Sequence, residues 1–306
     1  MACSKPLRPT PTTMPSPRRF LQLDVFANRL LDGNPLAVIV DATGLDGDAM
    51  QRIARWTNLS ETTFLLPPTQ AQADYRVRIF TPRQELPFAG HPSVGSAYAA
   101  IEAGLVPAGK TALLQECAAG LLPVQVIGEG PSRIVHVQAP PAQLTAVDDT
   151  LRAHLGAALH VELVQEQTCH ADNGPHWIIC DLREAASVRS LQPDMGAIAR
   201  LCEQHEAIGI SVFGREHGED VAMAVRAFCP ADGIPEDPVT GSANAAIMAW
   251  LATRSDRAGY GLRYRASQGR EVGRDGYVEV AHDPASGAIT IGGACVIGVR
   301  GGLHIG

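Results

Sequence analysis

Two stretches far apart in the chain are nearly the same: HPSVGSAYAAI, from His91 to Ile101, and DPVTGSANAAI, from Asp237 to Ile247. Seven of their eleven positions are identical, but the first residue is histidine in one copy and aspartate in the other. Each copy places proline, glycine, serine and alanine where a loop would lead into a helix. This repetition predicts that a larger part of the chain is duplicated.

Three further matches lie upstream of the two copies, in the same order in both halves of the chain. RIFTP (78–82) matches RAFCP (226–230), MQRIAR (50–55) matches MGAIAR (195–200), and NPLAVIVD (34–41) matches GPHWIICD (174–181). Each match is weak alone, because short alanine-rich segments resemble one another by chance. Four matches in order indicate two homologous units of similar fold.

The spacing of apolar residues predicts mixed helices and strands in both units. In the first unit we expect strands at 21–27, 36–41, 62–67 and 74–80, and helices at 46–59 and 93–104. In the second unit we expect strands at 176–182, 207–214 and 222–228, and helices at 194–205 and 241–252. The segment 277–306 is typical of antiparallel strands with glycine-rich turns, and its last strand is expected to return to the first unit.

The composition is that of a soluble globular protein, with 45% hydrophobic and 19% charged residues. A chain of 306 residues is long enough for two domains. The net charge of −7 gives no general attraction to nucleic acid, and no apolar run has the length of a membrane helix. The start of the chain, residues 1–17, is rich in Pro, Thr and Ser and lacks the apolar region of a secretory signal, so we expect a disordered tail.

The cysteines and histidines give no sign of a metal site. Seven cysteines are scattered without CxxC spacing: Cys3, Cys117, Cys169, Cys180, Cys202, Cys229 and Cys295. An odd and unpatterned set predicts reduced thiols in a cytoplasmic protein, where buried cysteine behaves as a small hydrophobe. Because His and Cys do not cluster at ligand spacings, we expect no metal.

The repeated segment has the chemistry of an anion site. Gly and Ser let backbone N–H groups approach a ligand, and a helix start stabilises an anion by about 0.3–1 kcal/mol when exposed and up to about 2 when partly buried. If the units pack about a pseudo-twofold axis, the two copies face each other across a cleft and hold a small carboxylate-bearing molecule. His91 and Asp237 would then be equivalent acid/base groups, one from each unit.

Glu61, in NLSETTFLLP, is a third candidate acid/base group, and it has no polar counterpart in the second unit. One placed proton-transfer group contributes about 10²–10⁴-fold to a rate. Structural interpretations stay open for each candidate. Asp237 suits a helix N-cap, Glu61 a solvated or capping carboxylate, His91 a turn, and Ser242 close helix packing.

These motifs resemble those of the phenazine-biosynthesis PhzF-like family, which shares the diaminopimelate-epimerase fold. The matching stretches run from about Phe20 nearly to the end: LDVFANRLLDGNPLAVIVDA, ARWTNLSETTFLLPP, RIFTPRQELPFAGHPSVGSAYA, RAFCPADGIPEDPVTGSANAAIMAWL and SQGREVGRDGYVEV. The pairing of FAGHP with EDPVTGSA is specific to that family. The resemblance implies an α+β fold with two pseudo-symmetric lobes, each a curled, mostly antiparallel sheet around a central helix. We expect an N-terminal lobe of residues 18–137 plus 290–306 and a C-terminal lobe of residues 138–289.

The resemblance also implies an isomerase without cofactor, commonly a homodimer, that shifts a proton or double bond on a small cyclic or amino-acid-like carboxylate. By this resemblance Glu61 moves the proton, and His91 and Asp237 orient or relay it. The expected substrate-binding residues are Ser60, Gly90, Gly241 and Ser242. The GRDGYVEV segment departs from the Pro-Ser type sequence of many relatives, which would alter a wall of the cleft.

Two other functions stay open: an amino-acid epimerase or racemase that uses carboxylate and histidine groups, and a non-catalytic small-molecule-binding protein. A two-thiol racemase is disfavoured, because the loops PFAGHP and PEDPVTGS hold no cysteine and Cys229 lies a loop upstream. A serine hydrolase is disfavoured, because no GxSxG elbow surrounds Ser242.

Overall fold

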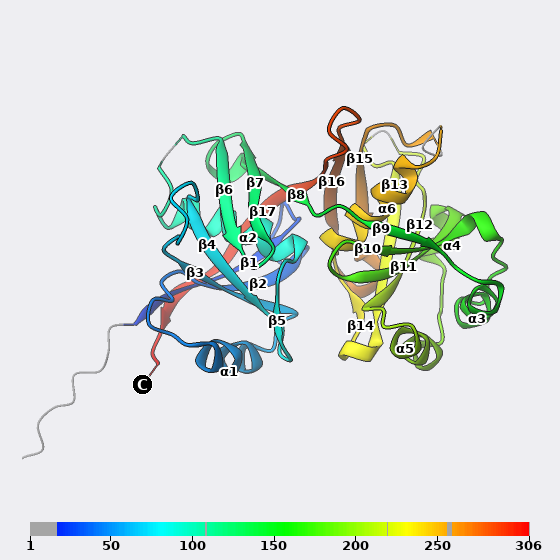
Figure 1. Ribbon diagram of the computed structural model, residues 1–306, viewed down its shortest axis with the longest axis horizontal. Coiled ribbons are helices and arrows are strands. Elements are labelled where there is room, and N and C mark those ends of the chain that lie inside the picture. Colours follow the sequence, from blue (N-terminus) through cyan, green and yellow to red (C-terminus); the bar gives the residue numbers. More distant parts are fainter. Residues whose placement is uncertain (1–16, 108, 219, 256–258, 306) are drawn as a thin grey trace, which may run out of the picture.

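The structure, a computed structural model, describes residues 17–107, 109–218, 220–255 and 259–305. The expected disordered tail, residues 1–17, lies outside the described residues except for Pro17. Figure 1 shows two bodies of secondary structure side by side along the long axis of the molecule. We call the part that contains residues 18–139 the first body and the part that contains residues 143–282 the second body.

The elements of the first body are listed here in chain order. They are β1 (Arg18–Val25), β2 (Asn34–Ile39), α1 (Gly47–Thr57), β3 (Glu61–Leu66), β4 (Tyr75–Phe80), β5 (Glu85–Leu86), α2 (Gly90–Glu102), β6 (Ala112–Cys117), β7 (Gly120–Ile127), η1 (Gly130–Ser132) and β8 (Ile134–Ala139).

The second body follows, and the last strand runs on from it. Its elements are β9 (Gln143–Ala146), α3 (Asp149–Leu159), η2 (Gln165–Gln167), β10 (Thr168–Asp172), β11 (His176–Glu184), α4 (Ala185–Arg189), α5 (Met195–Gln204), β12 (Gly209–Arg215), β13 (Met223–Cys229), η3 (Pro230–Asp232), β14 (Ile234–Asp237), α6 (Gly241–Ala252), β15 (Arg263–Gln268), η5 (Arg270–Val272), β16 (Gly276–His282) and then β17 (Ile289–Leu303).

The two bodies repeat one order of strand pairing. In the first body β2 and β3 are parallel, β3 and β4 antiparallel, β4 and β6 parallel, and β6 and β7 antiparallel. In the second body β11 and β12 are parallel, β12 and β13 antiparallel, β13 and β15 parallel, and β15 and β16 antiparallel. The duplication predicted from the sequence is therefore present in the fold.

The helices α1 and α5 begin in the same way. Asp46 accepts a hydrogen bond from the N–H of Ala49 at 2.8 Å, and Asp194 accepts one from the N–H of Ala197 at 2.9 Å. An aspartate N-cap satisfies one of the N–H groups that the first turn of a helix leaves without a partner. Both helices lie close to their predicted positions, and each buries one apolar face against its sheet.

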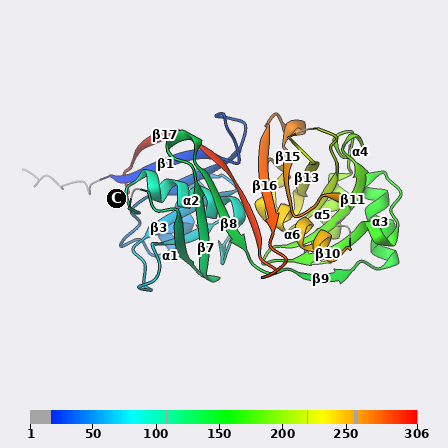
Figure 2. The same cartoon turned by 90° about the horizontal axis from the view of Figure 1, so that it is seen from above.

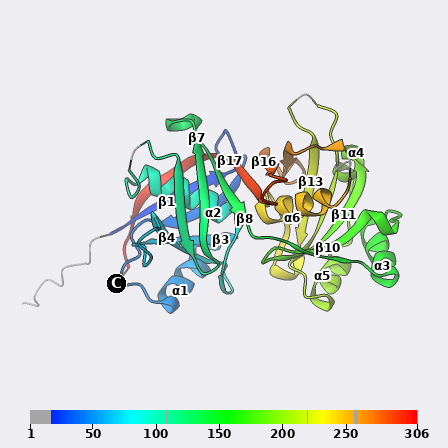
Figure 3. The same cartoon turned by 45° about the horizontal axis from the view of Figure 1, so that its top comes forward.

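The helices α2 and α6 lie among the strands of their bodies (Figure 3). α2 is buried from Gly90 to Ala100, and α6 is buried from Gly241 to Met248. Most of their residues are small or apolar on every side of the helix, which is typical of helices enclosed by protein. α2 begins at Gly90, one turn earlier than the predicted start of this helix at residue 93.

The strand β17 connects the two bodies. Residues 289–292 pair with β16 on one side and with β8 on the other, and the later part of the strand pairs with β1, where Leu303 lies opposite Arg18. Figure 2 shows this red strand running from the second body along the first. Between β1 and β8, it closes the strands of the first body into a ring around α2. The predicted return of the last strand to the first unit is confirmed.

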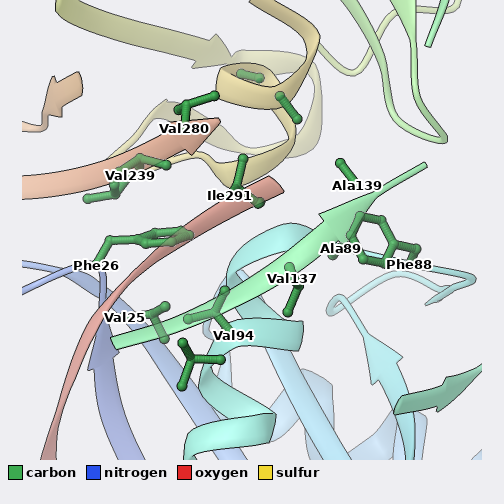
Figure 4. Close-up of a cluster of buried hydrophobic side chains, with 14 of the residues drawn as sticks. Val25, Phe26, Phe88, Ala89, Val94, Val137, Ala139, Val239, Val280 and Ile291 are labelled. Carbon is green, nitrogen blue, oxygen red and sulfur yellow. The ribbon is translucent and has the colours of Figure 1, made fainter. Parts of the chain in front are cut away.

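One apolar core runs through the seam between the bodies. Figure 4 shows Ile291 of β17, with Val94 and Val137 of the first body on one side and Val239 and Val280 of the second body on the other. All five side chains are fully or almost fully buried. A shared core of this kind stabilises the arrangement of the bodies relative to each other, because separating them would expose apolar surface to water.

Matched ion pairs show which residues of the two bodies correspond. Arg78 holds Glu85 through Nε and Nη2, each 2.6 Å from a carboxylate oxygen, and Arg226 holds Glu236 in the same way at 2.9 and 2.8 Å. A bidentate fork fixes the orientation of its two partners as well as their distance. The forks align ELPFAGH, which starts at Glu85, with EDPVTGS, which starts at Glu236.

The predicted equivalence of His91 and Asp237 is therefore wrong. In the alignment set by the forks, His91 corresponds to Ser242, and Asp237 is the last residue of β14, before α6 begins. The repeated letters were misleading because Gly95 lies in the second turn of α2, whereas its sequence match, Gly241, is the first residue of α6. Alanine-rich helices match at several offsets, so identity alone did not fix the register.

Candidate active site

A cavity of about 370 Å³ lies between the two bodies. Its wall is formed by the start of β3, the loop after β4, the start of α2, the start of β11, the loop after β13 and the start of α6. Every residue predicted to be catalytic or to bind substrate lines it: Ser60, Glu61, Gly90, His91, Asp237, Gly241 and Ser242. The structure thus brings together in one cavity residues that the sequence placed in three separate segments.

The N-termini of α2 and α6 meet at this cavity. A Cβ on Gly90 would lie 3.1 Å from the Cα of Gly241, and a Cβ on Gly241 would lie 3.2 Å from the Cα of Gly90. Either Cβ would also lie within 2.7 Å of the Cδ1 of Ile291, so glycine is needed at both positions. Neither N-cap residue, Ala89 or Thr240, caps its helix with a side chain. The first N–H groups of both helices are therefore available to an anion, which both helix dipoles would stabilise.

Glu61 and His91 face each other at the cavity wall. Glu61 Oε2 lies 3.4 Å from His91 Nε2, and neither atom has a hydrogen-bond partner among the described residues. Burial, followed by the negative charge of Asp237, raises the pKa of Glu61 to about 8, against the opposing hydrogen bond of Ser60. Burial lowers the pKa of His91 to about 3. At neutral pH the pair is thus a protonated carboxyl beside a neutral imidazole.

This pair excludes the structural interpretations of both residues. Glu61 is the first residue of β3 and is neither a solvated carboxylate nor a helix cap. His91 is a buried residue of α2 and does not lie in a turn. Buried polar atoms without partners are rare in proteins and mark places where a ligand or water completes the hydrogen bonding. Glu61 Oε2 and His91 Nε2 are therefore free to hydrogen-bond with a bound molecule.

Asp237 is held from both bodies. Its Oδ1 accepts a hydrogen bond from Asn34 Nδ2 at 2.9 Å, and its Oδ2 accepts one from Thr240 Oγ1 at 2.5 Å. Burial raises the pKa of Asp237 to about 6 in spite of these two hydrogen bonds. The N-cap of α6 is Thr240, so the interpretation of Asp237 as a helix cap is wrong.

Gln268 fixes the loop that carries Asp237, and the sequence analysis did not single it out. Its Oε1 accepts from the N–H of Thr240 at 3.0 Å and from Asn244 Nδ2 at 3.2 Å, and its Nε2 donates to the carbonyl of Asp237 at 3.0 Å. This buried amide therefore uses both ends to hold the start of α6. The only sequence signal was its place in the SQGREV stretch that resembles the family.

Ser242 and Ser60 are also held by neighbours that the sequence analysis missed. Trp177 Nε1 donates to Ser242 Oγ at 3.2 Å, and Asn173 Nδ2 donates to the Ser242 carbonyl at 2.9 Å. Ser60 Oγ donates to Asn34 Oδ1 at 3.3 Å. Because the Ser242 hydroxyl accepts from an indole and no base contacts it among the described residues, it is suited to hydrogen bonding with a ligand and not to nucleophilic attack.

Cys229 lines the cavity as well, which its distance from the expected loops did not predict. Burial, followed by the charge of Asp237, raises the pKa of this thiol well above its usual range, so it is protonated at neutral pH. It is the one cysteine among the described lining residues, and Thr81 occupies the corresponding place after β4. A reaction with two opposed thiols has no second thiol on this part of the wall.

The described residues contain neither a cluster of metal ligands nor a membrane-spanning helix. No three His, Cys, Asp or Glu side chains within them are grouped so as to hold a metal ion. No helix in the described ranges has the length and the apolar content that crossing a bilayer demands.

Comparison with known proteins assigns the chain to a family that includes named isomerases. The family model described as phenazine biosynthesis-like protein matches residues 23–301, and the chain belongs to that family. It is 36% identical over 291 residues to antisense-enhancing sequence 1 of Schizosaccharomyces pombe, covering 91% of this chain and 97% of that protein. It is 35% identical to a trans-2,3-dihydro-3-hydroxyanthranilate isomerase of Pseudomonas aeruginosa, covering 84% of this chain and 87% of that protein.

Solved structures agree with this assignment. A PhzF-family phenazine biosynthesis protein of Bacillus anthracis superimposes with a TM-score of 0.80 at 28% identity, covering 94% of this chain and 99% of that one. A probable proline racemase of Agrobacterium radiobacter superimposes with a TM-score of 0.68 at 14% identity, which shows that the fold is shared. The protein is thus an isomerase of this family, and a purely non-catalytic binding role is disfavoured.

Proposed function

We propose that this isomerase works without a cofactor and moves a proton, and with it a double bond, on a small carboxylate-bearing substrate that is cyclic or amino-acid-like. The observation that carries the proposal is the buried Glu61–His91 pair, a protonated carboxyl beside a neutral imidazole, in a cavity that also contains two helix N-termini. The pKa of Glu61 lies closer to neutrality than that of an ordinary glutamate, as a general acid or base at physiological pH requires.

The geometry suggests how the residues would divide the reaction. The substrate carboxylate binds at the N–H groups of Gly90, Gly241 and Ser242. The Glu61 carboxyl gives its proton to one end of a carbon–carbon double bond while the double bond moves along by one carbon. The C–H bond at the allylic carbon breaks, and that proton returns to Glu61, so substrate and enzyme each keep their atoms. His91 and Asp237 orient the reacting groups and relay the proton.

The test replaces Glu61 by glutamine. Thermal-shift screening of cyclic and aromatic amino acids and dihydro-acids, including trans-2,3-dihydro-3-hydroxyanthranilate, identifies ligands. Solvent deuterium incorporation in D2O, followed by NMR, then measures proton transfer. Removing a general acid/base is expected to slow exchange by about 10²–10⁴-fold while the ligand still binds. Glu203→Gln, on the exposed side of α5, is the matched control. Full exchange in Glu61→Gln would refute the assignment.

A second candidate is an amino-acid epimerase, favoured by the presence of a titratable carboxyl from each body, Glu61 and Asp237, on the same cavity. Epimerisation needs a proton donor and an acceptor on opposite faces of one carbon. Exchange at the α-carbon together with loss of optical activity would identify this reaction. Deuterium at a vinyl or allylic carbon with unchanged α-hydrogen would identify the double-bond shift.

We also propose how the chain divides into lobes, where the protein is located and how many copies assemble. The first and second bodies are taken as the two pseudo-symmetric lobes, residues 18–137 plus 290–306 and residues 138–289, and the repeated strand pairing supports this division. The described cysteines are free, which supports a cytoplasmic location. We propose a homodimer on the family resemblance alone, and light scattering after size-exclusion chromatography tests it directly.

A further inference from the structure

Arg83 and Asp232 form an ion pair between the two bodies at the cavity. Arg83 Nη1 lies 3.1 Å from Asp232 Oδ1, and both residues line the wall. Their side chains are 62% and 41% exposed, whereas His91 and Ser242 at the helix starts are 5% and 8% exposed. The ion pair therefore lies at the mouth of the cavity, and the helix N-termini lie at its buried end.

This ion pair leaves most of the guanidinium unused. One N–H group of Arg83 contacts Asp232, and the described part of the chain offers no partner to Nε or Nη2. An exposed ion pair of this kind contributes about 0.2–1 kcal/mol, so it is easily exchanged. Arg78 and Arg226, by contrast, each use two N–H groups in a fork with a glutamate of their own body. Among these three arginines, only Arg83 lines the cavity, and its Nε and Nη2 have no partner among the described residues.

The backbone beneath Arg83 is fixed. Thr81 Oγ1 accepts hydrogen bonds from the N–H of Arg83 at 3.1 Å and of Gln84 at 3.0 Å, and the N–H of Thr81 donates to the Gln84 carbonyl at 2.8 Å. A turn closed by side-chain and backbone hydrogen bonds holds its Cα atoms in place. The base of the Arg83 side chain is thus positioned at the mouth, while its long stem lets the guanidinium turn inward.

Arg83 is also the one arginine or lysine among the described lining residues. The other ionisable side chains of the described lining are Glu61, His91, Cys229, Asp232 and Asp237, of which three are carboxylic acids. An anionic group near the mouth would therefore find a full positive charge at Arg83 and at no other described lysine or arginine of the wall. The neutral amide of Gln84 lies beside it.

We propose that Arg83 is a specificity-determining residue that binds a second carboxylate of the substrate, so that the substrate is a dicarboxylate. The inference rests on the proposed function, because it takes this cavity as the substrate site. The first carboxylate lies at the helix N-termini, and the second replaces Asp232 at the mouth. A ligand carboxylate accepts two parallel N–H bonds from a guanidinium, whereas Asp232 accepts one.

The experiment compares diacids with monoacids of the same skeleton. Isothermal titration calorimetry measures isophthalate against benzoate, and glutarate against butyrate, on wild type, Arg83→Ala and Asp232→Ala. Wild type is expected to bind at least one diacid about tenfold more tightly than its monoacid, as hydrogen bonds to a charged group allow. Arg83→Ala loses this preference. Asp232→Ala keeps or increases it, because the guanidinium no longer has a competing partner.

The two variants distinguish binding of a ligand carboxylate by Arg83 from a purely structural role of Arg83 in joining the two bodies. If Arg83 only ties the bodies together, both variants lose the same ion pair and change the affinities in the same way, which overturns the proposal. A diacid preference that survives in Arg83→Ala, or that is missing from wild type in both pairs, also overturns it. The binding measurement does not depend on turnover. Normal exchange with no diacid preference therefore refutes this inference alone, and a diacid preference without exchange in any ligand refutes the proposed function.

Discussion

Replacing Glu61 by glutamine is expected to stabilise the protein, by an amount that grows with pH. Burial and the charge of Asp237 raise the pKa of Glu61 from 4.5 to about 8. Between these two values the folded protein holds a proton that the unfolded chain has released, so folding has to neutralise a carboxylate. Glutamine keeps the shape of the protonated carboxyl and has no charge to neutralise.

The sign and the size of this stability difference follow from the number of protons that the folded and the unfolded states bind. From pH 4.5 to about 8 the folded state binds one more proton at Glu61, so the wild-type free energy of unfolding falls by about 1.4 kcal/mol per pH unit through this group. Its contribution is intact below the unfolded pKa and is lost as the pH rises through the folded pKa. At pH 7 the variant is therefore expected to exceed wild type by about 3 kcal/mol, and near pH 4 by almost nothing.

Urea unfolding followed by circular dichroism, in buffers from about pH 4.5 to 8.5, measures this difference for each protein. Other titrating groups affect both proteins and largely cancel in the subtraction. Glu203→Gln on α5 controls for the loss of one carboxylate. A difference that stays constant between about pH 5 and 8 would mean that Glu61 is already ionised in the folded protein, and its assignment as the proton donor would then be wrong.

Three further outcomes are expected. The kcat/KM for the identified substrate should rise through about pH 6 as Asp237 ionises and fall through about pH 8 as Glu61 loses its proton. A flat pH profile would contradict the requirement for an ionised Asp237 and a protonated Glu61. Gly241→Ala places a Cβ 2.7 Å from the Cδ1 of Ile291, and overpacking of about 1–3 kcal/mol together with weaker ligand binding should follow in urea unfolding and calorimetry. Cys229→Ser should keep solvent deuterium exchange into the ligand close to the wild-type rate, because the Cys229 thiol stays protonated in the wild-type protein. Loss of this exchange would instead indicate that the Cys229 thiol takes part in proton transfer.

The sequence was sufficient for the elements that depend on local pattern. Apolar periodicity and aspartate caps predicted α1 and α5 close to their observed positions, and the repeated RxFxP segments predicted equivalent strands. The predicted site residues all line one cavity, because the helix starts at Gly90 and Gly241 meet across the seam. That convergence followed from duplication, since related units pack their equivalent segments face to face.

The contacts that position the site could not be predicted, because they join residues far apart in the chain. Asn34 reaches Asp237, 203 residues away, and Gln268 reaches the loop before α6 from another strand. Asparagine and glutamine in a strand carry no local signal of their partners. The sequence alignment of the two copies was wrong for a related reason. The residues that α2 and α6 share are those that any buried helix of small residues uses. The ion pairs of Arg78 and Arg226, which give the correct alignment, appear only in the three-dimensional structure.

The path of β17 has a consequence for how the protein is made. This strand lies between β1 and β8, yet in the chain it follows the whole second body. The first body therefore stays open while the whole second body is being synthesised, with the apolar interior around α2 exposed until β17 has been made. The first body therefore cannot complete its fold before the second body has been synthesised. Removal of residues 289–303 would leave both bodies without a shared strand, so synthesis through residue 303 is itself a condition for forming the site.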